Sequence, residues 1–329
     1  MSKRGQAVKT NQDISPSIAI LGVPLEDGTH EKGCLMGPDA LRTAGIIETL
    51  EGLGHHTADH GNLTPRQVTA ASTRSGSARN FEAIAGWTQA LADMAYAMAQ
   101  DTFPIFLGGD HALSIGSVAG LARHAAECSR PLYVLWLDAH PDFNTPATSQ
   151  SGNIHGMSVA AFCGDPDLAG LYAEPLRHPV HPSHVHMIGI RSVDLDERLR
   201  LQEQRVLVND MRVIDEVGVI RPLQQLIDEV KATNAMLHVS LDVDFLDPSI
   251  APAVGTTVPG GATFREAHLI MELLHESECV TSLDLVELNP FLDHRGMTAE
   301  LMTDLTASLF GRKIFDRRTR HPGPQTGPQ

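Results

Sequence analysis

Short apolar segments alternate with longer segments of helical character along most of the chain. Alternation of this kind is typical of a mainly parallel β-sheet covered by helices on both faces, so it predicts an α/β fold with three α/β/α layers. The apolar patterns predict strands at 17–23, 103–107, 132–137, 186–190, 236–241 and 280–286. They predict helices from Pro38 and over 81–99, 115–127, 222–232, 263–276 and 298–310.

Capping residues support two of these helices. Asn80 is a favourable residue type to cap the helix 81–99, and Thr263 with Glu266 fits a capping box. No internal repeat or linker divides the chain. We therefore expect a single domain over 17–311, between flexible ends at 1–16 and 312–329.

Charge and cysteine content exclude several classes of protein. The net charge of −15 argues against a nucleic-acid binder and against an anionic membrane surface as partner. The 4 cysteines are scattered and form no Cys-x-x-Cys pair, which fits a reducing cytosol. No signal peptide and no apolar run of about 20 residues are recognisable. These features predict a cytoplasmic protein.

Acidic and histidine residues follow three of the predicted strands. The strand 132–137 runs into Asp138, His140 and Asp142, which alternate and so share one face of an extended segment. His111 follows 103–107, and Asp242 and Asp244 follow 236–241. The carboxyl edge of a parallel sheet is where ligands bind, so these side chains are expected to meet there.

Four carboxylates and two imidazoles suit two divalent metal ions that share bridging carboxylates. Oxygen-rich ligation with a few nitrogens favours Mn²⁺, and no thiolate is near to select zinc. Such a pair of ions would lower the pKa of a bound water and produce hydroxide near neutral pH. Taken alone, each motif has a simpler explanation: an Asp-x-Asp sequence after a strand is usually a turn with solvated carboxylates, and Gly-Gly is common in turns. The combination at three strand ends favours the metal site.

Glu287 and His155 allow two interpretations each. A lone carboxylate at a strand end commonly pairs with a nearby cation, but Glu287 in the same cleft would suit a planar guanidinium group. His155 is either a packed histidine or a proton shuttle. The histidines of 178–186 match no metal motif and are interpreted as loop, and Trp87 and Trp136 as core.

Four motifs of the chain resemble those of the ureohydrolase superfamily, and of the arginase family in particular. They are GGDHALSIG, DAHPDFNTPATSQSGNIHG, SLDVDFLDPSIAPAVGTTVPGG and SLDLVELNP, within a similarity that spans residues 18 to 310. The resemblance implies a binuclear manganese hydrolase, with Co²⁺ or Ni²⁺ as alternatives. It also implies that the protein forms a homotrimer or homohexamer. Its expected role is in arginine metabolism, as in the urea cycle.

The resemblance implies a role for each motif residue. One metal would be held by His111, Asp138, Asp142 and Asp242, and the other by Asp138, His140, Asp242 and Asp244. Asn144, Ser151 and Asn153 would bind the α-carboxylate of L-arginine, and Asp194 with Glu197 its α-ammonium. Thr256 and Glu287 would line the guanidinium end, His155 would shuttle protons, and Asp142 would also orient the hydroxide. The products would be L-ornithine and urea.

The chain departs from the family pattern at three places. The acidic loop often written Asp-x-Asp-Pro-Gly-Glu reads SVDLDE at 192–197, Phe245 replaces a frequent glycine, and 257–259 reads Thr-Val-Pro. None of these removes a metal ligand. Two alternatives stay open: a related hydrolase of agmatine or 4-guanidinobutyrate, and a metal-binding partner protein without catalysis. The retained His155 speaks against the second, because a protein without turnover needs no proton shuttle.

Overall fold

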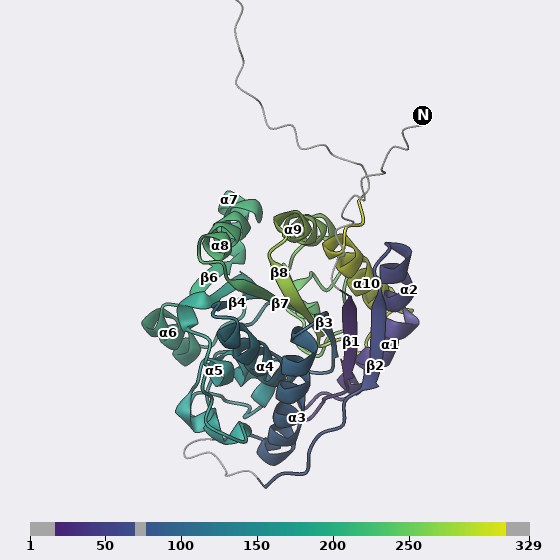
Figure 1. The fold of residues 1–329 in the computed structure, drawn as a ribbon. Coiled ribbons are helices and arrows are strands. Elements are labelled where there is room, and N and C mark those ends of the chain that lie inside the picture. Colours follow the sequence, from purple (N-terminus) through teal and green to yellow (C-terminus); the bar gives the residue numbers. More distant parts are fainter. Residues whose placement is uncertain (1–16, 70–76, 314–329) are drawn as a thin grey trace, which may run out of the picture.

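A computed structural model describes residues 17–69 and 77–313 of the chain. Within these ranges an 8-stranded, fully parallel sheet has the order β2-β1-β3-β8-β7-β4-β5-β6 (Figure 1). Its strands are β1 Ile18–Val23, β2 Thr57–Asn62, β3 Phe103–Gly108, β4 Leu132–Leu137, β5 Val185–Ile190, β6 Leu207–Asp210, β7 Met236–Asp242 and β8 Val280–Val286. The helices are α1 Gly37–Thr43, α2 Ile46–Gly52, α3 Phe81–Ala99, α4 Ser114–Glu127, α5 Ser158–Phe162, α6 Leu195–Gln204, α7 Met211–Val217, α8 Ile220–Ala232, α9 Phe264–Ser277 and α10 Met297–Leu309.

Alternate residues of each central strand enter two separate hydrophobic cores. In β4, Val134 and Trp136 pack with α3, α4 and α5, whereas Leu135 and Leu137 belong to the core formed with α1, α2 and α7 to α10. Figure 1 shows these two helix groups on opposite faces of the sheet. The predicted three-layer α/β/α architecture is confirmed.

The six predicted strands are all present, and two edge strands were not predicted. β2 is a polar segment with mostly exposed residues, and β6 has only 4 residues. An edge strand can form its backbone ladder without burying its side chains, so it leaves no apolar pattern in the sequence. The helix α6 was missed for a related reason, since only Glu197 and Leu201 of it are buried.

One of the two predicted helix caps is correct. Thr263 accepts from the Glu266 N–H at 3.3 Å, and Glu266 accepts from the Thr263 N–H at 2.8 Å, which is the predicted capping box of α9. Asn80 instead has a left-handed backbone with φ of 52°, and its Nδ2 donates to the carbonyl of Asp27 at 2.9 Å. The side-chain cap predicted for α3 is therefore wrong.

The predicted flexible segment 1–16 lies outside the described residues, as does the second one from residue 314 onward. Among the residues that the structure describes, no helix is long and apolar enough to cross a membrane.

Candidate metal centre and substrate cavity

The strand order brings the predicted site residues to one edge of the sheet. β3, β8, β7 and β4 are neighbours, and the loops that follow them carry His111, Glu287, Asp244 and Asp138. All strands are parallel, so these loops emerge at the same edge. The sequence predicted candidate ligands at strand ends, and the order of the strands makes those ends adjacent.

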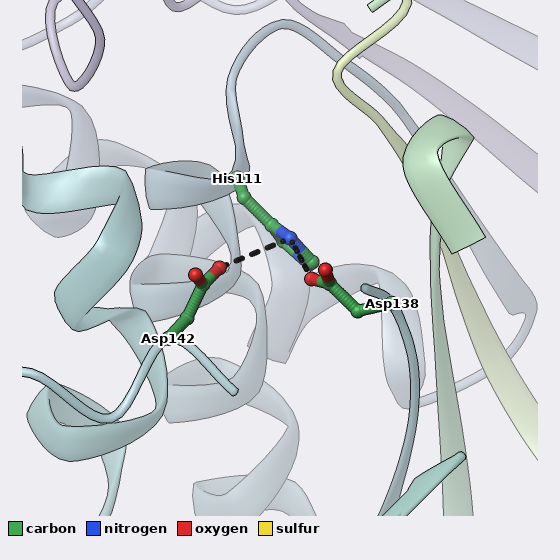
Figure 2. A group of neighbouring side chains, drawn as sticks. All are labelled: His111, Asp138 and Asp142. Carbon is green, nitrogen blue, oxygen red and sulfur yellow. Dashed lines mark ion pairs between the residues drawn. The ribbon is translucent and has the colours of Figure 1, made fainter. Parts of the chain in front are cut away.

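His111 lies at the centre of a first group of candidate ligands. Its Nδ1 is 3.0 Å from Asp138 Oδ2, 3.3 Å from Asp142 Oδ2 and 2.9 Å from Asp242 Oδ2. Figure 2 shows the imidazole between the carboxylates of Asp138 and Asp142. One ligand atom from each of these three residues lies within 4.8 Å of the others. One nitrogen thus faces three carboxylate oxygens.

His140 forms a second group with the other oxygen of Asp138. Its Nδ1 is 2.9 Å from Asp244 Oδ2 and 3.6 Å from Asp138 Oδ1. These three ligand atoms also lie within 4.8 Å of one another. Asp138 therefore belongs to both groups, which is the arrangement expected of a carboxylate that bridges two ions.

The chemistry of this donor set fits divalent metal ions. His111 Nδ1 and Asp138 Oδ2 are buried and lie 3.0 Å apart, but neither makes a hydrogen bond of acceptable geometry with any described residue. Burial, followed by the charge of Asp138, raises the pKa of Asp142 and Asp244, and burial with the charge of Asp244 raises that of Asp242. Burial opposes a charge on His140, but its contacts with Asp138 and Asp244 raise its pKa to about 12. The cluster thus needs positive charge, which metal ions supply.

Trp136 and Ser240 hold the ring of His111 from two sides. The indole of Trp136 stacks on the imidazole with centroids 3.9 Å apart and planes 4° apart. Ser240 Oγ lies 2.9 Å from His111 Nε2, which leaves Nδ1 to face the carboxylates. Trp136 Nε1 also donates to the His140 carbonyl at 3.2 Å. Trp136 is a core residue as predicted, but the sequence pattern carried no signal of these contacts.

A cavity opens from this cluster towards the predicted amino-acid-binding residues. Besides the carboxylates and His140, it is lined by Asn144, His155, Gly156, Ser192, Asp194, Glu197, Thr256 and Glu287. Ser151 and Asn153 do not line this cavity in the part of the chain described. Ser151 is exposed, and Asn153 is 4% exposed with its Nδ2 2.8 Å from His30 Nδ1.

Glu287 is almost fully buried and already has three neighbouring donors. Its Oε1 lies 2.8 Å from His155 Nδ1 and accepts from the His111 N–H at 2.8 Å, and the Cys34 thiol donates to Oε2 at 3.6 Å. Burial opposes its charge, but His155 holds the pKa of Glu287 below its usual value. Because a carboxylate accepts, His155 donates through Nδ1, which leaves Nε2 as the ring nitrogen for proton exchange.

Glu197 and Asp194 also form part of the local structure. They make the capping box of α6, and Glu197 Oε1 accepts from the Phe143 N–H at 2.8 Å. Burial raises the pKa of Glu197 to about 7. Glu197 therefore ties α6 to the loop after β4, while both carboxylates reach the cavity.

Asp142 and Glu287 have left-handed backbones, with φ of 48° and 65°. Residues other than glycine rarely adopt this conformation, and it costs about 1–3 kcal/mol. Among the described residues it occurs at eight positions other than glycine, and two of these belong to the motifs of the site. The histidines of 178–186, by contrast, contribute to neither group of candidate ligands found in the described ranges.

Comparisons with known proteins identify the family. The model of the arginase family matches residues 16–311. The chain is 56% identical over 301 residues to an arginase of Agrobacterium fabrum, covering 91% of this chain and 92% of the relative. It is 55% identical over 300 residues to an arginase of Brucella suis, covering 91% of this chain and 98% of the relative.

A solved structure gives the same result for the fold. The arginase of Bacillus caldovelox superposes with a TM-score of 0.82 at 42% identity, covering 91% of this chain and 100% of that chain. The chain belongs to the arginase family of hydrolases, which act on guanidino C–N bonds through a binuclear metal centre.

Proposed function

We propose that this protein is an arginase, which hydrolyses the guanidinium group of L-arginine to give L-ornithine and urea. One observation carries the proposal: a single cavity is lined at once by the His–Asp cluster, by Glu287 and His155, and by Asn144 and Asp194. A metal centre, a guanidinium partner and groups for an amino acid are the three parts that this reaction needs.

Two divalent ions would be held by the two groups of ligands. His111, Asp138, Asp142 and Asp242 would bind one, and Asp138, His140, Asp242 and Asp244 the other. Bound there, such ions supply Lewis acidity and a nucleophile at neutral pH. The oxygen-rich donor set supports Mn²⁺, with Co²⁺ or Ni²⁺ as alternatives.

The remaining site residues would bind the guanidinium and move protons. Glu287 offers a carboxylate to the planar cation, and Thr256, whose Oγ1 donates to Asp244 Oδ2 at 3.1 Å, lines the same end of the cavity. His155 would pass a proton through Nε2 to the leaving amine, since its Nδ1 is engaged by Glu287. Asp142 would orient the attacking group.

The other end of the cavity would recognise the amino acid. Asn144 would donate to the α-carboxylate, and Asp194 with Glu197 would bind the α-ammonium. Ser151 and Asn153 remain proposed carboxylate ligands on the family resemblance alone, since neither lines the cavity. The family resemblance supports a homotrimer or homohexamer. A cytoplasmic location is supported by the four free cysteines, since cysteines stay reduced in the cytoplasm.

Urea release from L-arginine, agmatine and 4-guanidinobutyrate by the Mn²⁺-loaded protein tests the proposal. We expect L-arginine to be turned over far faster than the other two, because only it carries both an α-carboxylate and an α-ammonium group. Fast turnover of agmatine without turnover of L-arginine would contradict it. The variant Asn144→Ala should raise the KM for L-arginine. Its metal content should stay unchanged, since Asn144 is not among the proposed metal ligands.

A further inference from the structure

We propose that Thr148 is a positioning residue for substrate recognition: its hydroxyl fixes Asn144 so that the amide N–H groups face the cavity. The inference rests on the proposed function, in which Asn144 binds the α-carboxylate of L-arginine. Thr148 does not line the cavity itself. It acts through Asn144, and its role follows from the direction of three hydrogen bonds.

The first two bonds fix the hydroxyl of Thr148. The backbone N–H of Thr145 can only donate, and it does so to Thr148 Oγ1 at 2.9 Å. The single hydroxyl hydrogen is then available for Asn144 Oδ1, which lies 2.8 Å away. The competing acceptor, Thr145 Oγ1, is farther at 3.4 Å. Thr148 is therefore a donor to the amide oxygen of Asn144.

The third bond decides which way the amide of Asn144 faces. A hydroxyl can either donate or accept, so Thr148 alone would tolerate both orientations of the amide. A carboxylate oxygen accepts, and Asp194 Oδ2 lies 3.4 Å from Asn144 Nδ2. Turning the amide over would place two acceptor oxygens against each other. Only one orientation satisfies Thr148 and Asp194 together.

This orientation presents donors where a carboxylate ligand would need them. Nδ2 carries two hydrogens, and Asp194 takes one, which leaves the other for a ligand in the cavity. The backbone of Asn144 is held as well, since its N–H donates to the Gly156 carbonyl at 3.2 Å. Without the Thr148 hydroxyl, only the longer contact to Asp194 orients the amide. The amide of Asn144 would then be less well oriented before the α-carboxylate binds, and ordering it on binding would cost affinity.

The test compares Thr148→Val, which has nearly the same shape, with Thr148→Ser, which keeps the hydroxyl. In the Mn²⁺-loaded protein we expect Thr148→Val to raise the KM for L-arginine by about tenfold with kcat almost unchanged, the effect of a weakened hydrogen bond to a charged group. Thr148→Ser should stay close to the wild type. L-norvaline, an α-amino acid without a terminal cation, should lose affinity as an inhibitor by the same factor, because it uses only the amino-acid end.

A double-mutant cycle separates positioning from a general loop defect. In the Asn144→Ala background, Thr148→Val should have no further effect on the KM, because the group that it positions is absent. A persisting effect there, a KM unchanged in Thr148→Val, or a matching fall in kcat would each overturn the inference while leaving the proposed function intact. A wild-type protein that releases no urea from L-arginine would overturn the proposed function, and this inference with it.

Discussion

Removal of divalent metal should lower the thermal stability of this protein by a predictable amount. Asp138, Asp142, Asp242 and Asp244 are only 1%, 8%, 3% and 2% exposed, and they converge on two imidazoles. Ions that bind this cluster bind the folded chain and find no comparable site in the unfolded chain. Metal binding therefore adds directly to the free energy of unfolding.

The magnitude follows from linkage and from chain length. An ion present at about 1,000 times its Kd stabilises the folded state by about 4 kcal/mol. Unfolding a chain of 329 residues near 60 °C gains entropy of about 0.7 kcal/mol/K, from about 2.1 cal/mol/K per residue. Each such ion should therefore raise the Tm by about 6 °C, and two ions by about 12 °C.

Differential scanning fluorimetry of chelator-treated protein across a Mn²⁺ series measures this shift. Asp138→Asn changes the residue shared by both groups of ligands and should remove most of it. Asp215→Asn, an exposed carboxylate of α7, should keep the full shift. An equal Tm with and without Mn²⁺, or an undiminished shift in Asp138→Asn, would refute the assignment of the metal centre.

Three further predictions concern residues around this centre. His155→Asn should lower kcat for urea release by about 10²–10⁴-fold with bound metal unchanged, because a proton donor is lost; unaltered kcat would exclude the shuttle. Trp136→Phe keeps a ring over His111 but loses the N–H that donates to the His140 carbonyl. Calorimetry should therefore show that the affinity for metal falls by about tenfold. The control Trp87→Phe should leave the affinity for metal unchanged. Asp247 has its pKa lowered to about 2 by the Ser249 hydroxyl and by backbone N–H groups, so the stability it contributes is present above pH 3.8 and is lost as the pH falls towards 2. In urea unfolding, Asp247→Asn should therefore differ from the wild type by less than about 1 kcal/mol near pH 6 and by clearly less near pH 2, where about half of the folded-state carboxyl is protonated. A pH-independent difference would contradict this.

The six predicted strands are all present, because burial on both faces of a strand leaves an apolar run in the sequence, whereas the short buried helix α5 was not predicted. β1, β3 and β4 are buried on both faces, so each appears as an apolar run, and β5 does so apart from His186. β2 and β6 lie at the edges of the sheet and carry no such run. Asn80 shows a different limit, because its side chain bonds to Asp27, a residue far away in the sequence.

The clustering of the candidate ligands was predictable because they lie at or shortly after the ends of buried strands, and because the alternation in Asp138, His140 and Asp142 is local. Their partners were not predictable in the same way. Trp136 packs on His111 and Cys34 reaches Glu287 only after segments that are distant in the sequence come together. Ser151 and Asn153 belong to the predicted motif but lie outside the cavity lining, because the loop that carries them turns Asn153 towards His30.

The sequence by itself determined the fold class, the strand ends that carry the candidate ligands and the family, since these depend on local periodicity and on motifs. Only the tertiary structure decided which of these strand ends are neighbours. The order β3-β8-β7-β4 places Glu287 beside His111, and it brings Asp138 into contact with both groups of candidate ligands. It also decided the direction in which Asn144 faces, through Thr148 and Asp194. Such relations depend on contacts between residues far apart in the chain, and a one-dimensional pattern does not record them.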